Sequence, residues 1–472
     1  MPSGSLLQLS AHGVQDIYLI GNPQFSFFKS VYRRHTNFVM ESILGTLDGT
    51  TDFGNRLVCK LPRSGDLVNG IVLEIDLPEL VGSGADDDNS IRYISNVGHA
   101  IIDYVELHIG GQLIDKQYGE WMHIWNELSQ TDPKKRALHS MVKTDSRNGP
   151  TTLIIPLEFW FCRHIGSALP LIALQYHDVE IVIQLRPLSQ LYNFGPIRYY
   201  NLSDGGSVAT PYEYIRSKGL VFSPSVAGKT LVYPGGSQTL TYVDPDTISV
   251  PIALTTAQLD RVYIDPEYTL VGKPKFRGMR IFMDYIFLDT YERKQFAQAQ
   301  HRYLIEQLQF SGDQGITASQ SAFRLPLNFN LPVKELFWLI QTDENLTRNN
   351  LMDFRNTPDE YYQLPSDVLD NLTIQFNGID RFQSRRGEYF RLLHQYQHHT
   401  NPVPDLYIYT YSFAITPEEL QPSGSANFSK IDNVDLIVNL VNGHLDSRIR
   451  VYGINYNVLR IMNGMGGVAF ST

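Results

Sequence analysis

The chain has 472 residues, of which 43% are hydrophobic and 12% aromatic, enough apolar material for more than one core. Charged residues make up only 19%, while Tyr, Phe, Gly and Pro are abundant, which favours strands joined by many turns. The net charge of -10 disfavours direct binding to nucleic acid, and the presence of only two cysteines excludes a disulfide framework.

The N-terminal segment is expected to form an amphipathic helix. Asn22 can cap a helix that begins at Pro23, and the aromatic residues that follow would then share one side. This aromatic face could pack on the first domain of its own chain or on another protein, and contact with anionic lipid is a weaker alternative. The candidate arm residues are Phe25, Phe28, Lys29, Tyr32, Arg33 and Arg34.

The next elements occur in an order that is found twice along the chain. In both copies an alternating apolar strand is followed by a Gly-containing turn, a Gly-Glu step and a short helix, and three further strands come later. The first copy has strands at 105–111, 153–161, 179–185 and 279–288, and the second has them at 372–378, 406–413, 434–440 and 448–456. A tandem duplication of one β-fold explains this order.

The two helices carry the same apolar stripe at positions i, i+3, i+4 and i+7, so we expect both to belong to the structural core. Any single amphipathic helix would show this spacing, but the strand, turn and Gly-Glu step that precede each helix make a chance match less plausible. The stripes are Trp121, Ile124, Trp125 and Leu128 in the first helix and Tyr389, Leu392, Leu393 and Tyr396 in the second.

Domain limits follow from the repeat. Residues 290–300 contain good helix formers and predict a short bridge between the two halves. Residues 192–275 contain repeated Gly and Pro interruptions and predict a large surface insertion in the first half. We therefore expect an all-β fold with an N-terminal arm at 1–27, a first sandwich at 28–295 and a second sandwich at 296–472.

Catalytic and metal-binding motifs are absent from the sequence. There is no phosphate-binding loop, no nucleophile elbow and no C-x-x-C pair, and no two histidines are separated by one residue as in a cupin metal site. His394 and His398 could share a helix face, but we expect them to lie in a polar helix end. No catalytic residue, metal or cofactor is predicted, and a carbohydrate-binding or carbohydrate-active sandwich is kept as the alternative function.

Several long segments resemble the major capsid proteins of nucleocytoplasmic large DNA viruses, as in iridoviruses, chloroviruses and marseilleviruses. Together they span nearly the whole chain, although nothing in the 192–275 insertion resembles the family. The segments are Gln15–Phe38, Phe287–Ala297, Tyr303–Gln307, Leu327–Leu336, Gln421–Asp432 and Asn463–Phe470.

The resemblance implies a double jelly roll made of two tandem eight-stranded sandwiches, with short helices and long surface loops. It also implies a non-enzymatic capsid protein that forms a homotrimer of nearly hexagonal outline within an icosahedral shell. Expected partners are neighbouring capsomers, minor capsid, cement and penton proteins, and an internal viral membrane that would place the arm on the inner face. The implied location is the virion, after synthesis and assembly in the host cytoplasm.

Overall fold

The computed structural model describes residues 3–83, 91–143, 149–194, 202–204, 212–217, 228, 230–233, 236–244, 247–254, 263–265, 269–355 and 367–470. The chain forms two compact units, Met1–Phe38 and Val39–Thr472. The first unit contains helix α1 (Ser3–Ser10), the 3-10 turn η1 (Val14–Asp16) and helix α2 (Ile17–Ile20).

The helix expected to begin at Pro23 does not form. Residues 21–37 contain only turns and irregular chain, and Asn22 has a φ of 50°, outside the extended conformation of a helix-capping residue. The physical reason is composition, because the Phe, Ser, Val, Tyr and Thr residues of this segment have lower helix propensities than Ala, Leu or Glu. The candidate arm residues therefore do not share a helical face.

The first sandwich contains two four-stranded sheets, with a short extra strand on the first of them. Its strands alternate between buried and partly exposed residues, as expected for a sheet with one face on a core. One sheet has the order β1 (Phe38–Gly45), β20 (Gly278–Leu288), β3 (Leu67–Leu77), β8 (Thr151–Pro156), with β9 (Leu169–Pro170) on β3; the other has the order β2 (Arg56–Lys60), β10 (Val179–Leu185), β6 (Ile102–Ile109), β7 (Gln112–Tyr118).

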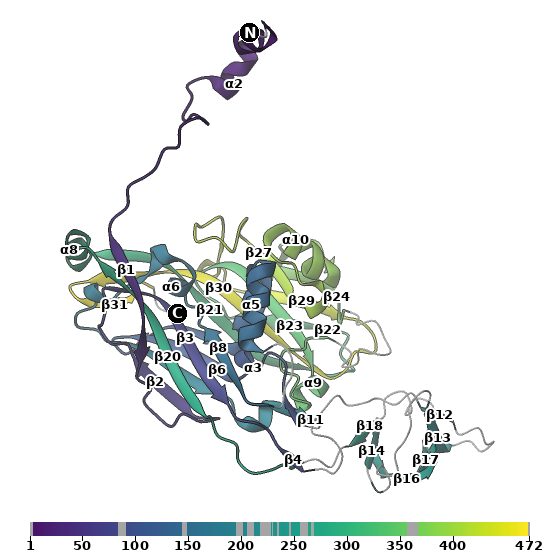
Figure 1. Ribbon diagram of the computed structural model, residues 1–472. Helices are drawn as coiled ribbons and strands as arrows, with labels where there is room; N and C mark the ends of the chain where they lie inside the picture. The colour runs from purple at the N-terminus through teal and green to yellow at the C-terminus, as the bar shows by residue number, and fades with distance from the viewer. Residues whose placement is uncertain are drawn as a thin grey trace. The chain divides into compact units, whose positions relative to one another are not determined.

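The second sandwich repeats this arrangement strand for strand. Its sheets have the order β21 (His301–Ile316), β30 (Ser447–Met462), β23 (Pro332–Thr342), β27 (Tyr409–Ser412) and the order β22 (Ala322–Pro326), β29 (Val434–Leu440), β24 (Leu369–Phe376), β25 (Ile379–Asp380). Short strands β28 (Ala426–Asn427), β31 (Met465–Val468) and β26 (Arg385–Arg386) pair with β23, β30 and β24. Two sheets with this strand order form a jelly roll, so the predicted double jelly roll is confirmed (Figure 1).

The repeated Gly-Glu step occupies the same place in both sandwiches. A Cβ atom added to Gly119 would lie 2.3 Å from the carbonyl oxygen of Ile102, at the start of β6. A Cβ atom added to Gly387 would lie 2.4 Å from the carbonyl oxygen of Leu369, at the start of the equivalent strand β24. Only glycine allows the chain to approach a strand so closely at both points.

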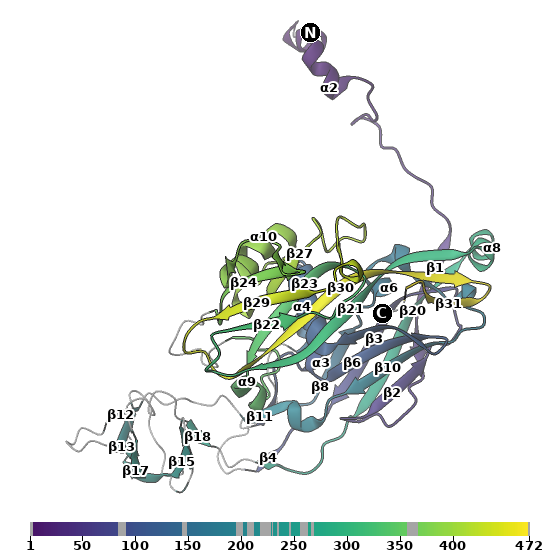
Figure 2. The same ribbon diagram turned by 180° about the vertical axis from the view of Figure 1, so that it is seen from behind.

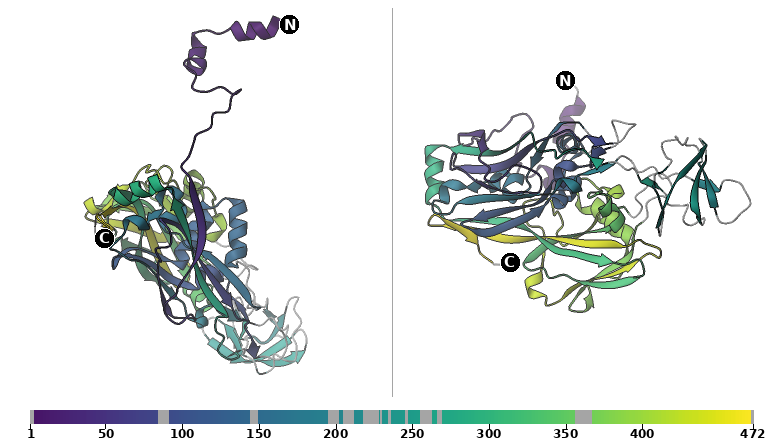
Figure 3. Two further views of the ribbon diagram at one scale, coloured as in Figure 1. Left: turned by 60° about the vertical axis from the view of Figure 1, so that its left-hand side comes forward. Right: turned by 90° about the horizontal axis from the view of Figure 1, so that it is seen from below.

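Each sandwich has its own core, and helices lie between and around the sandwiches (Figures 2 and 3). Among the described residues of this unit, the α-helices are α3 (Val97–Ala100), α4 (Gly119–Ser129), α5 (Asp132–Val142), α6 (Trp160–Arg163), α8 (Thr290–Gln298), α9 (Asp343–Thr347) and α10 (His394–His398), and a π-helical turn, η6 (Tyr389–Leu393), leads into α10. The 3-10 turns in the same described part of the chain are η2 (Ile165–Ser167), η3 (Leu171–Ala173), η4 (Leu188–Gln190), η7 (Pro404–Leu406) and η8 (Phe428–Lys430). The expected strand at 153–161 ends at Pro156, because the residues after it turn into α6.

The bridge lies wholly within the described residues, whereas the insertion is only partly described. α8 follows β20 of the first sandwich and precedes β21 of the second, as expected for a bridge between them. Much of 192–275 lies outside the described residues, and its described strands form small sheets. These strands are β11 (Tyr192–Phe194, paired with β5, Ile91–Tyr93), β12 (Leu202–Asp204), β13 (Tyr212–Ser217), β14 (Thr230–Tyr233), β15 (Gly236–Thr239), β16 (Thr241–Asp244), β17 (Thr247–Leu254), β18 (Tyr263–Asp265) and β19 (Thr269–Leu270, paired with β4, Gly82–Ser83).

Candidate functional site at the junction and on the exposed faces

The first predicted helix stripe lies in the junction between the two sandwiches. Trp121, Ile124, Trp125 and Leu128 of α4 are at most 4% exposed. They form a cluster with residues on the outer face of the second sandwich, including Phe337 of β23, whose ring centroid is 5.0 Å from that of Trp121. Met122, on another side of α4, packs in the first core. α4 therefore joins two cores.

A buried ion pair lies at the start of the same helix. The Arg450 guanidinium of β30 donates a hydrogen bond to Glu120, and the Tyr452 hydroxyl donates a second one at 2.7 Å. Burial and the Glu120 carboxylate raise the pKa of Tyr452 well above its usual value, so this hydroxyl remains a donor. The Glu120–Arg450 ion pair therefore joins the first sandwich to the second, in addition to the apolar contacts of α4.

A second charged cluster joins α6 to the second sandwich. Arg163 Nη1 lies 3.0 Å from Glu306 of β21, and the buried Lys334 ammonium of β23 contacts the same carboxylate. Although burial by itself would raise it, the positive charges of Lys334 and Arg163 hold the pKa of Glu306 below its usual range. The Arg163 guanidinium also lies 4.8 Å from the Trp125 ring, which adds a cation–π contact.

His399 is held between two carboxylates at the end of α10. Its Nε2 lies 2.8 Å from Glu335 of β23, and its Nδ1 lies 2.9 Å from Glu418 in the loop after β27. Burial opposes protonation, but the two carboxylates outweigh it and raise the pKa of His399 to about 9. The polar helix end expected around His394 and His398 is wrong for His394, which is buried together with Gln395 and His399.

The His399 cluster predicts a loss of stability in mild alkali. A pKa raised from 6.5 in the unfolded chain to about 9 in the folded protein stabilises the fold fully below pH 6.5. This contribution, about 3 kcal/mol, is lost as the pH rises through 9. Urea denaturation at a series of pH values from 6 to 9 should show this decline in the native chain and a flatter profile in His399→Gln. Parallel profiles would contradict the assignment.

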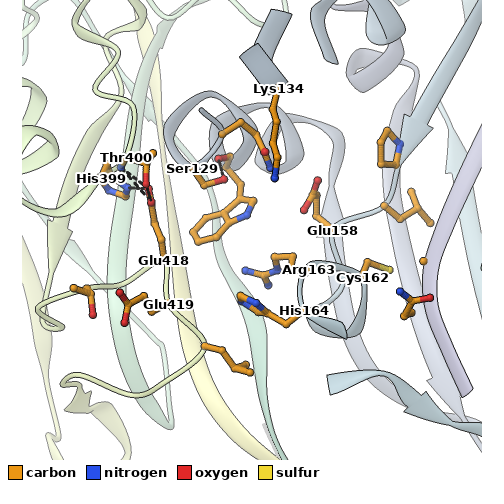
Figure 4. Close-up of a pocket in the computed structure, with 18 of the residues that line it drawn as sticks. Ser129, Lys134, Glu158, Cys162, Arg163, His164, His399, Thr400, Glu418 and Glu419 are labelled. Carbon is orange, nitrogen blue, oxygen red and sulfur yellow. Dashed lines mark hydrogen bonds and ion pairs between the residues drawn. The ribbon is translucent and has the colours of Figure 1, made fainter. Parts of the chain in front are cut away.

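A polar cleft of about 930 Å³ opens beside these clusters, lined by residues of both sandwiches. Figure 4 shows Arg163, His164 and Glu158 near its middle and His399, Glu418 and Glu419 on the side of the second sandwich. Burial raises the pKa of the Cys162 thiol, which keeps it protonated and a poor nucleophile. Within the described residues, no group of three or more His, Cys, Asp or Glu side chains could hold a metal ion.

The second predicted helix stripe is not a core element. Leu392 is 41% exposed, Leu393 46% and Tyr396 77%, whereas Tyr389 is partly buried against the second core. The second core is contacted instead by Phe390, which corresponds to Met122 of α4. The expectation was wrong because in both helices the stripe faces away from the sandwich that the helix belongs to. The second sandwich covers the stripe of α4, but the chain has no third sandwich to cover the stripe of the second helix.

The six arm residues are all exposed. Phe25 is 68% exposed, Phe28 99% and Tyr32 80%, and the side chains of Lys29, Arg33 and Arg34 are also exposed. Phe25 packs its ring edge against Phe27 with 5.0 Å between centroids. No described helix of the chain is long and apolar enough to cross a bilayer.

The alternative of carbohydrate binding has no exposed aromatic platform among the tryptophans. Trp121, Trp125, Trp160 and Trp338 are all at most 4% exposed and pack in the cores or in the junction. No tryptophan face is therefore open for stacking on a sugar.

Sequence reasoning missed the buried ion pairs of the junction. Glu120 and Arg450 are far apart in the chain, so no local pattern links them. One signal was present: the Gly-Glu step precedes both helices, and a glutamate repeated at the start of two duplicated helices indicates a repeated polar contact.

The chain matches known capsid proteins over most of its length. Residues 26–213 match the family described as "Major capsid protein N-terminus", and residues 292–467 match "Large eukaryotic DNA virus major capsid protein". The major capsid protein of Pyramimonas orientalis virus is 36% identical, with 99% of each chain covered. That of Phaeocystis pouchetii virus is 34% identical, with 99% of this chain and 100% of the relative covered.

Solved structures agree with this result. The capsid protein VP54 of Paramecium bursaria Chlorella virus 1 superposes with a TM-score of 0.68 at 29% identity, covering 95% of this chain and 100% of that one. The Faustovirus major capsid protein shares the fold, with a TM-score of 0.67 at 12% identity and 97% and 96% coverage. These proteins are structural components of the virion shell and not enzymes. This chain belongs to the major capsid proteins of large eukaryotic DNA viruses.

Proposed function

We propose that the chain forms a homotrimeric capsomer of nearly hexagonal outline that tiles the flat facets of an icosahedral shell. The observation that carries this proposal is the repetition of one jelly roll within the chain, with the same strand order in both copies. Three such chains supply six similar sandwiches, which suit a hexagonal lattice. The function is geometric, and the buried junction serves it by holding the two sandwiches at a fixed angle.

The parts of the chain have separate roles in this proposal. The first jelly roll (28–295) and the second (296–472) form the capsomer wall, and the 192–275 insertion is a surface feature. The arm (1–27 and the basic residues after it) lies on the inner face, above the internal membrane. Its exposed aromatic side chains and the charges of Lys29, Arg33 and Arg34 support contact with minor capsid proteins. Cement and penton proteins and neighbouring capsomers complete the partners, and assembly takes place in the host cytoplasm.

Light scattering after gel filtration tests the proposal. The purified protein should elute with three times the mass of one 472-residue chain, and electron microscopy should show threefold particles with six lobes. A trimer of this kind should bury more than about 2,000 Å² in total, as obligate assemblies do. A stable monomer across the accessible concentration range would contradict the proposal.

A further inference from the structure

The outer face of α4 shows what a jelly-roll helix of this chain packs against. Trp121 lies 5.0 Å from Phe337 of β23 and 5.9 Å from Tyr452 of β30, measured between ring centroids. The preceding Glu120 pairs with Arg450 of β30. As a result β23 is buried on both faces, on one side by its own core and on the other by α4.

The equivalent sheet of the first sandwich has no such cover. β3 is buried only on alternate residues, and the residues between them are half-buried. The pairs β3–β20 and β23–β30 each carry one bulged residue, Asn69 in β3 and Lys334 in β23, which aligns the two sheets residue by residue. Counted from this bulge, Val72 corresponds to Phe337, Phe282 to Tyr452 and Arg280 to Arg450.

The second helix is also uncovered, and it carries residues that correspond to those with which α4 contacts the second sandwich. Glu388 corresponds to Glu120 and is exposed. The outward-facing Leu392, Leu393 and Tyr396 follow it and are 41% to 77% exposed. Figure 2 shows α4 between the sandwiches and α10 at the outer margin of the second sandwich.

Each of the two uncovered faces carries one residue that corresponds to a member of the Glu120–Arg450 pair. Arg280 is 46% exposed and lies 3.3 Å from Glu74 and 3.0 Å from Asp76 of its own sheet. Arg280 occupies the position in the first sandwich that Arg450 occupies in the covered sheet of the second. Glu388 occupies the position in the second helix that Glu120, the partner of Arg450, occupies in α4. One chain thus carries both members of a second Glu–Arg pair. They lie on two surfaces that are not joined to each other at the junction between its own two sandwiches.

We infer that the second helix of one copy packs on the outer face of β3–β20 of a neighbouring copy, with Glu388 paired to Arg280 of that copy. The contact repeats between chains the junction that α4 makes within one chain. It is heterologous, so copies follow one another in one direction and a ring closes when the sixth sandwich meets the first. This inference rests on the proposed homotrimer and names the surfaces that form it.

A charge exchange tests the pairing. Glu388→Arg and Arg280→Glu each place like charges opposite one another, and each should raise the concentration at which the trimer half-dissociates by about tenfold or more. The double variant restores opposite charges and should return this concentration to within about threefold of the native value. Asp432→Arg, which reverses an exposed charge before β29 of the same sandwich, is the matched control and should leave it unchanged.

Cross-linking provides a readout that does not depend on charge near Glu74 and Asp76. Chains carrying Tyr389→Cys and chains carrying Phe282→Cys are co-expressed and treated with a short bismaleimide. Covalent two-chain products should form in the mixture and not with either chain alone. If the two cysteine variants form trimers but yield no mixed product, the inference is overturned. It is also overturned if both single charge variants dissociate at the same concentration as the native trimer. A native protein that is only monomeric would instead overturn the proposed function.

Discussion

Replacing Trp121 with alanine should lower the free energy of unfolding by about 3 to 5 kcal/mol, as expected for truncation of a large buried aromatic side chain. Trp121 is 2% exposed and contacts aromatic rings of the second sandwich. Helix α4 on one side of the resulting cavity and strands β23 and β30 on the other are each anchored in a separate core, so the space cannot collapse easily. Urea denaturation followed by circular dichroism measures the loss.

The matched control is Ile379→Ala in β25, because Ile379 is 74% exposed. This change should alter the free energy of unfolding by no more than about 0.5 kcal/mol. If the two variants unfolded at the same urea concentration, Trp121 would not hold the sandwiches together and the junction would have to depend on its ion pairs.

The duplicated fold was predictable because a jelly roll leaves local marks along the chain. Alternating residues such as those of Val179–Leu185 and Val434–Leu440 can bury only one face, and both segments are central strands β10 and β29. Gly119 and Gly387 mark the two points where the chain must approach a strand closely. These constraints act over a few residues, so they can be recognised without knowledge of the whole structure.

The direction in which a helix stripe faces could not be predicted in the same way. The stripes that contain Trp121 and Tyr396 have the same spacing, yet one is buried and the other exposed. The difference arises because the chain has a second sandwich to cover the first helix and none to cover the second. A local pattern shows that a face is apolar, and only the number of domains in the chain shows whether that face is covered within it.

The buried charges were unpredictable for a related reason. Lys334 and Glu335 lie in a strand in which nearly every residue is buried, where sequence patterns favour apolar side chains. Their partners, Glu306 and His399, come from other elements. Such pairs depend on tertiary packing and leave no periodic signal.

Replacing Glu306 with glutamine should destabilise the protein by about 3 to 5 kcal/mol, because it leaves a buried lysine without its counter-charge. Lys334 has no exposed side-chain surface. Arg163, which also pairs with Glu306, is 13% exposed and keeps its contact with Trp125. The urea midpoint of unfolding at neutral pH measures the effect, with Lys60→Met of an exposed pair as a control that should scarcely move it.

Adding Lys334→Met to Glu306→Gln tests the cause of this loss. The double variant removes the unpaired ammonium and should recover most of the stability, since a buried ion pair can be replaced by apolar groups at little cost.

Unfolding in acid provides a second check. A folded-state pKa of Glu306 below its unfolded value stabilises the fold above the unfolded pKa, and this stability is lost as the pH falls through the folded value. Below about pH 4.5 the native chain should therefore lose more stability than Glu306→Gln. In the first test, a double variant as unstable as Glu306→Gln would show that Lys334 is not the unpaired buried charge.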